Sequence, residues 1–142
     1  SNYVFSNNRA ITKSMITWWA YSFADQSLLS LESAFDIEHI YPRNRQQKEN
    51  SLKNEHSLEM LGNKSLLERR INIRASDYRF ADKIKYYEGF QTSKGKKEGT
   101  NIAELKSLAA CHSDWNEQDI TERSHCILNG FIEYLKTNHL LK

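Results

Sequence analysis

Residues 34–42, AFDIEHIYP, alternate apolar and polar side chains and end at the only proline of the chain. This alternation predicts a short β-strand, which Pro42 would end because proline cannot donate to a strand ladder. The strand carries two carboxylates, Asp36 and Glu38, and His39 follows them. None of these three side chains gains from packing in a core, so their presence together indicates a chemical role.

A second apolar run follows a polar stretch and is preceded by a turn signal. In LGNKSLLE, residues 61–68, the pair Gly62-Asn63 marks the turn and the run after it predicts a second strand. The other apolar residues recur mainly at helical spacing. The expected helices cover residues 9–24, 69–75, 78–89, 100–110 and 116–138. Few strands with helices outside them predict an α+β fold in which helix dominates.

Two segments of the chain are expected to be loops. Residues 43–57 are polar throughout and predict a long exposed loop, and the glycine-containing basic segment 92–100 predicts a mobile one. Helix caps are expected at the polar residues that precede helical patterns. Ser76 or Asp77 would cap the helix that ends at a glycine, and Asn116 would cap the last helix.

The composition allows one core of ordinary size, since 39% of the 142 residues are hydrophobic, and we expect a single domain. The apolar runs are far shorter than the roughly 20 residues that cross a bilayer, and the N-terminus does not show a basic region followed by an apolar one. Cys111 and Cys126 do not form a CxxC pair and predict no disulfide framework. Together these features predict a soluble, cytoplasmic protein with no membrane contact.

Positive charge is concentrated in the middle of the chain. The formal net charge is +2, but residues 69–97 hold nine basic and three acidic residues, whereas residues 100–142 hold four basic and six acidic ones. The middle segment would therefore attract a polyanion. A solvated surface with extra lysines would have the same composition, so charge alone leaves both interpretations open.

The polar residues between positions 36 and 72 suit the hydrolysis of a phosphodiester. Glu38 and Asn72 offer hard oxygen ligands, which Mg²⁺ prefers while it keeps several waters. A histidine side chain has an unperturbed pKa of about 6.5, so the neutral imidazole needed to take a proton from water is available at neutral pH, and His39 is the candidate. One cation and one base are the parts that such a reaction needs.

The ordered segments of the chain resemble a known nuclease family. DIEHIYP, then LGNKSLLE after a polar stretch, then an asparagine nine residues past the first one, then SDYRFADKIKYY occur in sequence. GTNIAELKSLA and DWNEQDITERSHCIL follow. This set resembles the HNH (His-Me finger) nuclease domain at the C-terminal end of GmrSD-like modification-dependent restriction enzymes. The resemblance covers most of the chain.

The resemblance implies a ββα-metal core over about residues 35–88, with flanking helices over about 9–24, 100–110 and 116–138. It assigns His39 as the general base and Glu38 as a metal ligand. Asn63 would brace the loop behind the histidine. Asn72 would be an oxygen ligand, which favours Mg²⁺, with Mn²⁺ or Ni²⁺ as substitutes, over zinc.

One conflict accompanies this assignment. Strict strand alternation points Glu38 and His39 to opposite faces, whereas the mechanism needs both near one phosphate. The resemblance therefore requires a twist or break at residues 40–42. If the strand is regular, Asp36 becomes the partner of Glu38 and is a second candidate ligand.

The expected function is a metal-dependent DNA endonuclease that leaves a 5′ phosphate and a 3′ hydroxyl and acts in bacterial restriction of phage or modified DNA. The resemblance implies that the chain is the C-terminal module of a longer protein with a sensing or nucleotide-hydrolysing N-terminal half, or a stand-alone version of that module. A homodimer would allow double-strand cuts. Two alternatives are a nucleic-acid-binding module without catalysis and a helical interaction domain of a larger defence assembly. The side chains expected to contact the phosphates of double-stranded DNA are Arg70, Arg74, Arg79 and Lys83, the last matching a lysine of the family's F..K pattern.

Overall fold

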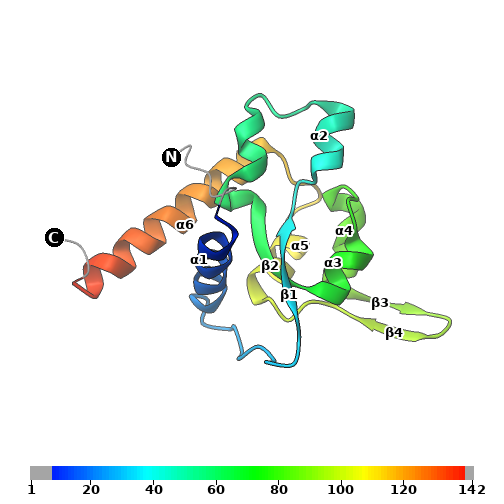
Figure 1. Cartoon of the computed structure of the whole chain (residues 1–142). Helices are drawn as coiled ribbons and strands as arrows, with labels where there is room; N and C mark the ends of the chain where they lie inside the picture. The colour runs from blue at the N-terminus through cyan, green and yellow to red at the C-terminus, as the bar shows by residue number, and fades with distance from the viewer. Residues whose placement is uncertain (1–7, 140–142) are drawn as a thin grey trace.

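The structure is a computed structural model that describes residues 8–139 (Figure 1). Its elements in chain order are α1 (Arg9–Tyr21), β1 (Phe35–His39), α2 (Arg43–Glu49), the 3₁₀ helices η1 (Glu55–Glu59) and η2 (Leu61–Asn63), β2 (Lys64–Glu68), α3 (Arg69–Ala75), α4 (Phe80–Glu88), β3 (Gly89–Thr92), β4 (Gly95–Glu98), α5 (Ala103–Cys111) and α6 (Glu117–Thr137). The predicted α+β class with helix dominant is confirmed. None of the helices in the described range is long and apolar enough to span a membrane.

The centre of the molecule is a unit of two strands and a helix. β1 and β2 pair antiparallel, with Phe35 opposite Glu68 and His39 opposite Lys64. α3 begins at the residue after β2 and packs against both strands. The two predicted strands and the helix after them are thus present, in the ββα order.

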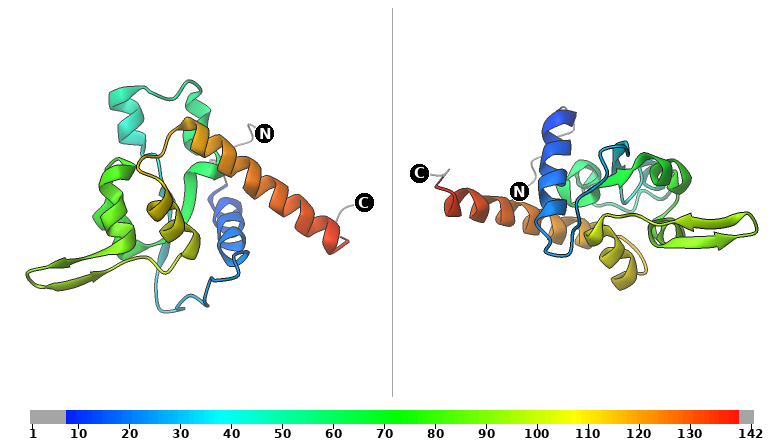
Figure 2. Two further views of the ribbon diagram at one scale, coloured as in Figure 1. Left: turned by 180° about the vertical axis from the view of Figure 1, so that it is seen from behind. Right: turned by 90° about the horizontal axis from the view of Figure 1, so that it is seen from below.

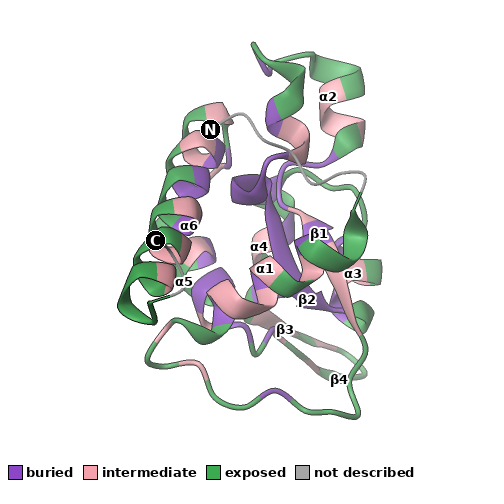
Figure 3. Ribbon diagram, turned by 60° about the vertical axis from the view of Figure 1, so that its left-hand side comes forward, coloured by how far each residue is buried: buried purple, intermediate pink, exposed green. Residues whose placement is uncertain are grey.

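Helices cover this unit from both sides (Figure 2). α1 lies against β2, while η2 packs on α6. All five residues of β2 are buried, and Figure 3 shows the buried residues gathered around the strands. Aromatic side chains complete the core on the α4 side, where Phe80 packs against Tyr87 and Trp115. The far end of α6 and the β3–β4 hairpin extend from opposite sides of this body (Figures 1 and 2).

The LGN segment before β2 is fixed to α6 by close contact. A Cβ atom at Gly62 would lie 1.9 Å from the carbonyl oxygen of Ile120, so this position accepts no larger residue. The Gly62 amide donates to the hydroxyl of Ser124, 2.8 Å away. Arg123 is buried, donates to the backbone carbonyls around the turn and pairs with Glu104 at 2.8 Å. The turn that leads into β2 therefore has a single position relative to α6.

Two segments that the sequence predicted as loops are regular structure. Part of the polar stretch 43–57 forms α2 and η1, and within segment 92–100 the residues Gly95–Glu98 form the second strand of an antiparallel hairpin. Gly95 has a φ of +121°, which only glycine adopts readily, and this residue turns the chain back into β4. The prediction of loops was wrong because both segments depend on contacts with distant residues.

The helix ends agree in part with the predictions. Asn116 caps α6 through a capping box with Asp119, as expected. α4 instead has Arg79 at its N-cap position, with no capping hydrogen bond from a side chain, so the prediction of a cap at Ser76 or Asp77 was wrong. Ser76 follows α3 with a φ of +50°, an unusual conformation for a residue with a side chain.

Candidate active site

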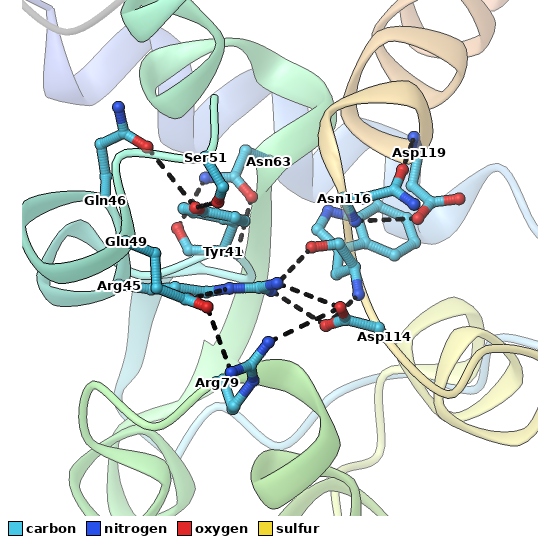
Figure 4. A network of polar contacts seen from close by, with 11 residues as sticks. Tyr41, Arg45, Gln46, Glu49, Ser51, Asn63, Arg79, Asp114, Asn116 and Asp119 are labelled. Atoms are coloured by element: carbon cyan, nitrogen blue, oxygen red, sulfur yellow. Dashed lines mark hydrogen bonds and ion pairs between the residues drawn. The ribbon is translucent and has the colours of Figure 1, made fainter. Parts of the chain in front are cut away.

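The chain bends directly after His39, and a buried asparagine holds the bend. β1 ends at His39, and the next two residues, Ile40 and Tyr41, are both buried, so the alternation of side chains stops there. Asn63 is fully buried, and its Oδ1 accepts from the Tyr41 amide at 2.7 Å (Figure 4). Its Nδ2 donates to the Tyr41 and Leu58 carbonyls at 2.9 Å each. The Asn63 side chain thus fixes the backbone behind the histidine.

His39, Glu38 and Asn72 line one cavity of about 350 Å³. Its walls come from the end of β1, from α2 and from the end of α3, with Asp77 at the α3 side. Glu38 and His39 therefore both border one cavity, although they are neighbours on a strand that pairs regularly through His39. The sequence analysis expected a break at residues 40–42, and the chain does bend away from the line of β1 there.

A carboxylate absent from the sequence prediction holds the imidazole. Both oxygens of Glu59 lie 3.2 Å from His39 Nε2. Lys64 Nζ lies 3.0 Å and Arg43 Nη2 lies 2.8 Å from the same carboxylate. The hydrogen bond and the charge of His39, together with the hydrogen bonds of Lys64 and Arg43, keep the pKa of Glu59 far below its ordinary value against the opposing effect of burial. Glu59 is therefore ionised at neutral pH and fixes the orientation of the His39 ring.

Glu38 belongs to a buried network beneath the cavity. Its Oε2 accepts from Lys83 Nζ at 3.1 Å and from the Tyr87 hydroxyl at 2.6 Å. Lys83 Nζ also donates to the His39 carbonyl at 2.8 Å. Burial lowers the pKa of Lys83, and the nearby Glu38 carboxylate partly opposes this shift. Burial and the Glu38 carboxylate both raise the pKa of Tyr87.

The burial of Lys83 corrects its predicted role. The side chain is fully enclosed, with a relative exposure of 0%, so it does not form a surface that contacts DNA phosphates. Its ammonium instead pairs with Glu38 and holds the end of β1. The matching F..K pattern therefore places a structural lysine here.

Asp36 is paired with Arg69 and Asn72. Arg69 donates to it through two nitrogens, the shorter bond being 3.0 Å, and this pairing with Arg69 is the first cause that lowers the pKa of Asp36. Asn72 Nδ2 also donates to it, at 3.4 Å. Asp36 is not among the described residues that line the cavity, so it positions the Asn72 amide.

The arginines that were predicted to contact phosphates differ in the residues that surround them. Arg70 is exposed on α3 and donates to the Glu98 carbonyl, and Arg74 lies half-buried one turn later. Arg79 instead lies 3.2 Å from Glu49 and 3.9 Å from Asp114, within the ion-pair network that joins α2 to the segment before α6 (Figure 4). Arg70 and Arg74 remain the better candidates for contact with a phosphate backbone.

The oxygen atoms in the cavity suit a hard divalent cation. Among the described residues, neither Glu38 Oε1 nor Asn72 Oδ1 accepts a hydrogen bond, and both residues line the cavity. Within residues 8–139, no group of three or more His, Cys, Asp or Glu side chains is arranged to hold a metal ion. Two protein oxygens with the rest supplied by water and phosphate is the pattern that fits Mg²⁺.

Comparison with known proteins identifies the family of this chain. A protein-family model described as "GmrSD restriction endonucleases, C-terminal domain" matches residues 2–129. The chain belongs to this family. No curated protein and no solved structure matches the chain. The matched residues thus include the cavity, the bend after His39 and every candidate site residue.

In acid, the domain should lose the stability that the ionised Glu59 contributes. Because its pKa is lower in the folded chain than the ordinary 4.5, the unfolded chain binds the proton first as the pH falls. The contribution is complete above about pH 4.5 and is lost as the pH falls toward the folded pKa. In urea unfolding from about pH 2.5 to pH 6, Glu59→Gln should reduce the pH slope of the unfolding free energy by up to about 1.4 kcal/mol per pH unit. The exposed Glu133→Gln should keep the parent slope, and equal slopes for all three proteins would contradict this role.

Proposed function

We propose that this domain is a metal-dependent DNA endonuclease of the HNH type that acts in restriction of phage or modified DNA. The observation that carries the proposal is that His39, Glu38 and Asn72 line one cavity in a chain whose family is described as restriction endonucleases. Duplex DNA is the substrate that this family description implies.

His39 is the proposed general base. A proton on Nε2 points to the Glu59 carboxylate, which leaves Nδ1 with a lone pair to take the proton of an attacking water. The imidazolium that forms is then stabilised by Glu59, which Arg43 and Lys64 keep ionised. Asn63 keeps the backbone after His39 in place during this step.

Glu38 and Asn72 would hold the divalent cation through Oε1 and Oδ1. A bound Mg²⁺ supplies Lewis-acid stabilisation of the negative charge that develops on the phosphate and the leaving oxygen. Lys83 and Tyr87 fix the Glu38 carboxylate from below, and Asp36 fixes the Asn72 amide. Attack of water on the phosphorus with loss of the 3′ oxygen gives a 5′ phosphate and a 3′ hydroxyl.

Cleavage of supercoiled plasmid with a panel of divalent ions tests the proposal. We expect nicked or linear product with Mg²⁺, activity with Mn²⁺ or Ni²⁺ as substitutes, and no product with a chelator. Product ends with a 5′ phosphate are expected when the fragments are labelled. DNA binding without cleavage in every ion would instead support the alternative of a binding module that has no catalysis.

Asn72→Ala should weaken the response to metal, because the variant loses one of the two protein oxygens near the cation. In a Mg²⁺ titration of plasmid cleavage, we expect half-maximal rate at about tenfold or more higher Mg²⁺, the usual order for loss of support at a metal site. Asn129→Ala, on the exposed side of α6, is the matched control and should titrate as the parent. Superimposable titrations for Asn72→Ala and the parent would remove Asn72 from the metal site.

A further inference from the structure

The β3–β4 hairpin projects from the body on the side of α3 and α4 (Figures 1 and 2). In its register Phe90 lies opposite Lys97 and Gln91 lies opposite Lys96. Phe90 packs edge-on against Tyr86, with ring centroids 5.4 Å apart, so one face of the hairpin is anchored at its base. Gln91 and Lys96 share the other face and are exposed.

The outer part of the hairpin has little that stabilises it within the chain. Among the described residues no third strand pairs with β3 or β4, and a two-stranded ribbon is by itself only marginally stable in water. Its base is joined to α3, where Arg70 donates to the Glu98 carbonyl at 3.2 Å. Beyond this base, both edges and one face of the hairpin therefore stay open to a partner.

The charge of the hairpin indicates the chemistry of that partner. Lys94 and Lys96 are exposed and Lys97 is half-buried, and within the described chain none of the three forms an ion pair. Glu98 is the only acidic residue of segment 89–98. A projecting ribbon with three unpaired ammonium groups is complementary to a polyanion.

We propose that the β3–β4 hairpin is a DNA-binding arm that lies in a groove of the duplex beside the cleaved phosphate; this inference rests on the proposed nuclease function. The major groove is about 12 Å wide and admits a two-stranded β-ribbon. α3 connects the hairpin with the cavity. Arg70 on α3 donates a hydrogen bond to the Glu98 carbonyl of the hairpin, and Asn72 and Ser76 line the cavity. The seven residues of α3 span about 10 Å, so one duplex can contact both places.

The test compares two triple variants with the same change of charge. Lys94→Gln/Lys96→Gln/Lys97→Gln removes the hairpin charges. Its control is Lys53→Gln/Lys106→Gln/Lys136→Gln, at exposed positions outside the hairpin. Binding to a duplex of about 20 base pairs is measured by fluorescence anisotropy across a salt series, with His39→Ala added so that the DNA is not cut. Plasmid cleavage by the same triple variants with His39 intact gives kcat and KM.

For the hairpin variant, the slope of the log association constant against log salt concentration should be less steep by about 0.9 for each phosphate that the lysines no longer neutralise. In plasmid cleavage the variant should raise KM while kcat changes little. The control triple should stay near the parent in both measurements. If the parent cuts DNA and the two triple variants behave alike, the hairpin proposal fails and the nuclease proposal stands. A parent that neither binds nor cuts duplex at low salt would overturn both.

Discussion

Replacing His39 with alanine is expected to lower the rate of plasmid cleavage in Mg²⁺ by about 10²–10⁴-fold, the usual contribution of a positioned general base. The loss should be in kcat, because the imidazole acts on the attacking water and contributes little to DNA binding. The ring is half-buried and lies at the end of β1, so its removal leaves the core packing in place. Initial rates measured at saturating plasmid give the value directly.

His125→Ala is the matched control, since His125 is exposed on α6 and outside the cavity. It should cut at the rate of the parent. A circular dichroism melt of both variants separates loss of chemistry from loss of fold. If folded His39→Ala cuts plasmid as fast as His125→Ala, His39 is not the base, and another group in the cavity must be sought.

The parts of the fold that could be predicted are those specified by local sequence. Alternation over β1, a proline after it, and the glycine-asparagine turn before β2 each act within a few residues. The Asn116 cap of α6 is equally local, because its partner lies three residues away. These features gave the ββα order and the helix-dominated class.

The elements that were missed depend on tertiary contacts. α2 has no buried residue and therefore no apolar periodicity to detect. It is held by Arg45, whose guanidinium pairs with Asp114 at 2.9 Å, 69 residues away in the chain (Figure 4). The hairpin is likewise joined to α3 by the hydrogen bond from Arg70 to the Glu98 carbonyl, 28 residues away in the chain, and its lysine-rich second strand has low β-propensity.

Several residues that support the candidate site were not predicted from the sequence. The approach of Glu59 to His39 joins η1 to β1 and has no local signal. The burial of Lys83 did have one, since Phe80, Lys83 and Tyr87 share one face of α4 at a spacing of three and four residues. Two aromatic residues on a face that packs in the core imply that a lysine between them is also enclosed.

Replacing Lys83 with methionine is expected to destabilise the domain by about 3–5 kcal/mol, the usual cost of removing one partner of a buried ion pair. Methionine fills much of the same space, so the loss arises mainly from the Glu38 carboxylate, which would keep only the Tyr87 hydroxyl as a donor. The His39 carbonyl also loses its donor. Urea unfolding at neutral pH, followed by tryptophan fluorescence, measures the change.

Two further variants separate the buried charge from other causes. Lys85→Met, on the exposed side of the same helix, should change stability by less than about 0.5 kcal/mol. Lys83→Met/Glu38→Gln should recover part of the loss, because the unpaired buried charge is then removed. If Lys83→Met unfolds like the parent yet binds DNA more weakly, the lysine faces phosphate and the buried pair is not present in solution. If binding per folded molecule is unchanged while stability falls, Lys83 supports the end of β1 from within the core.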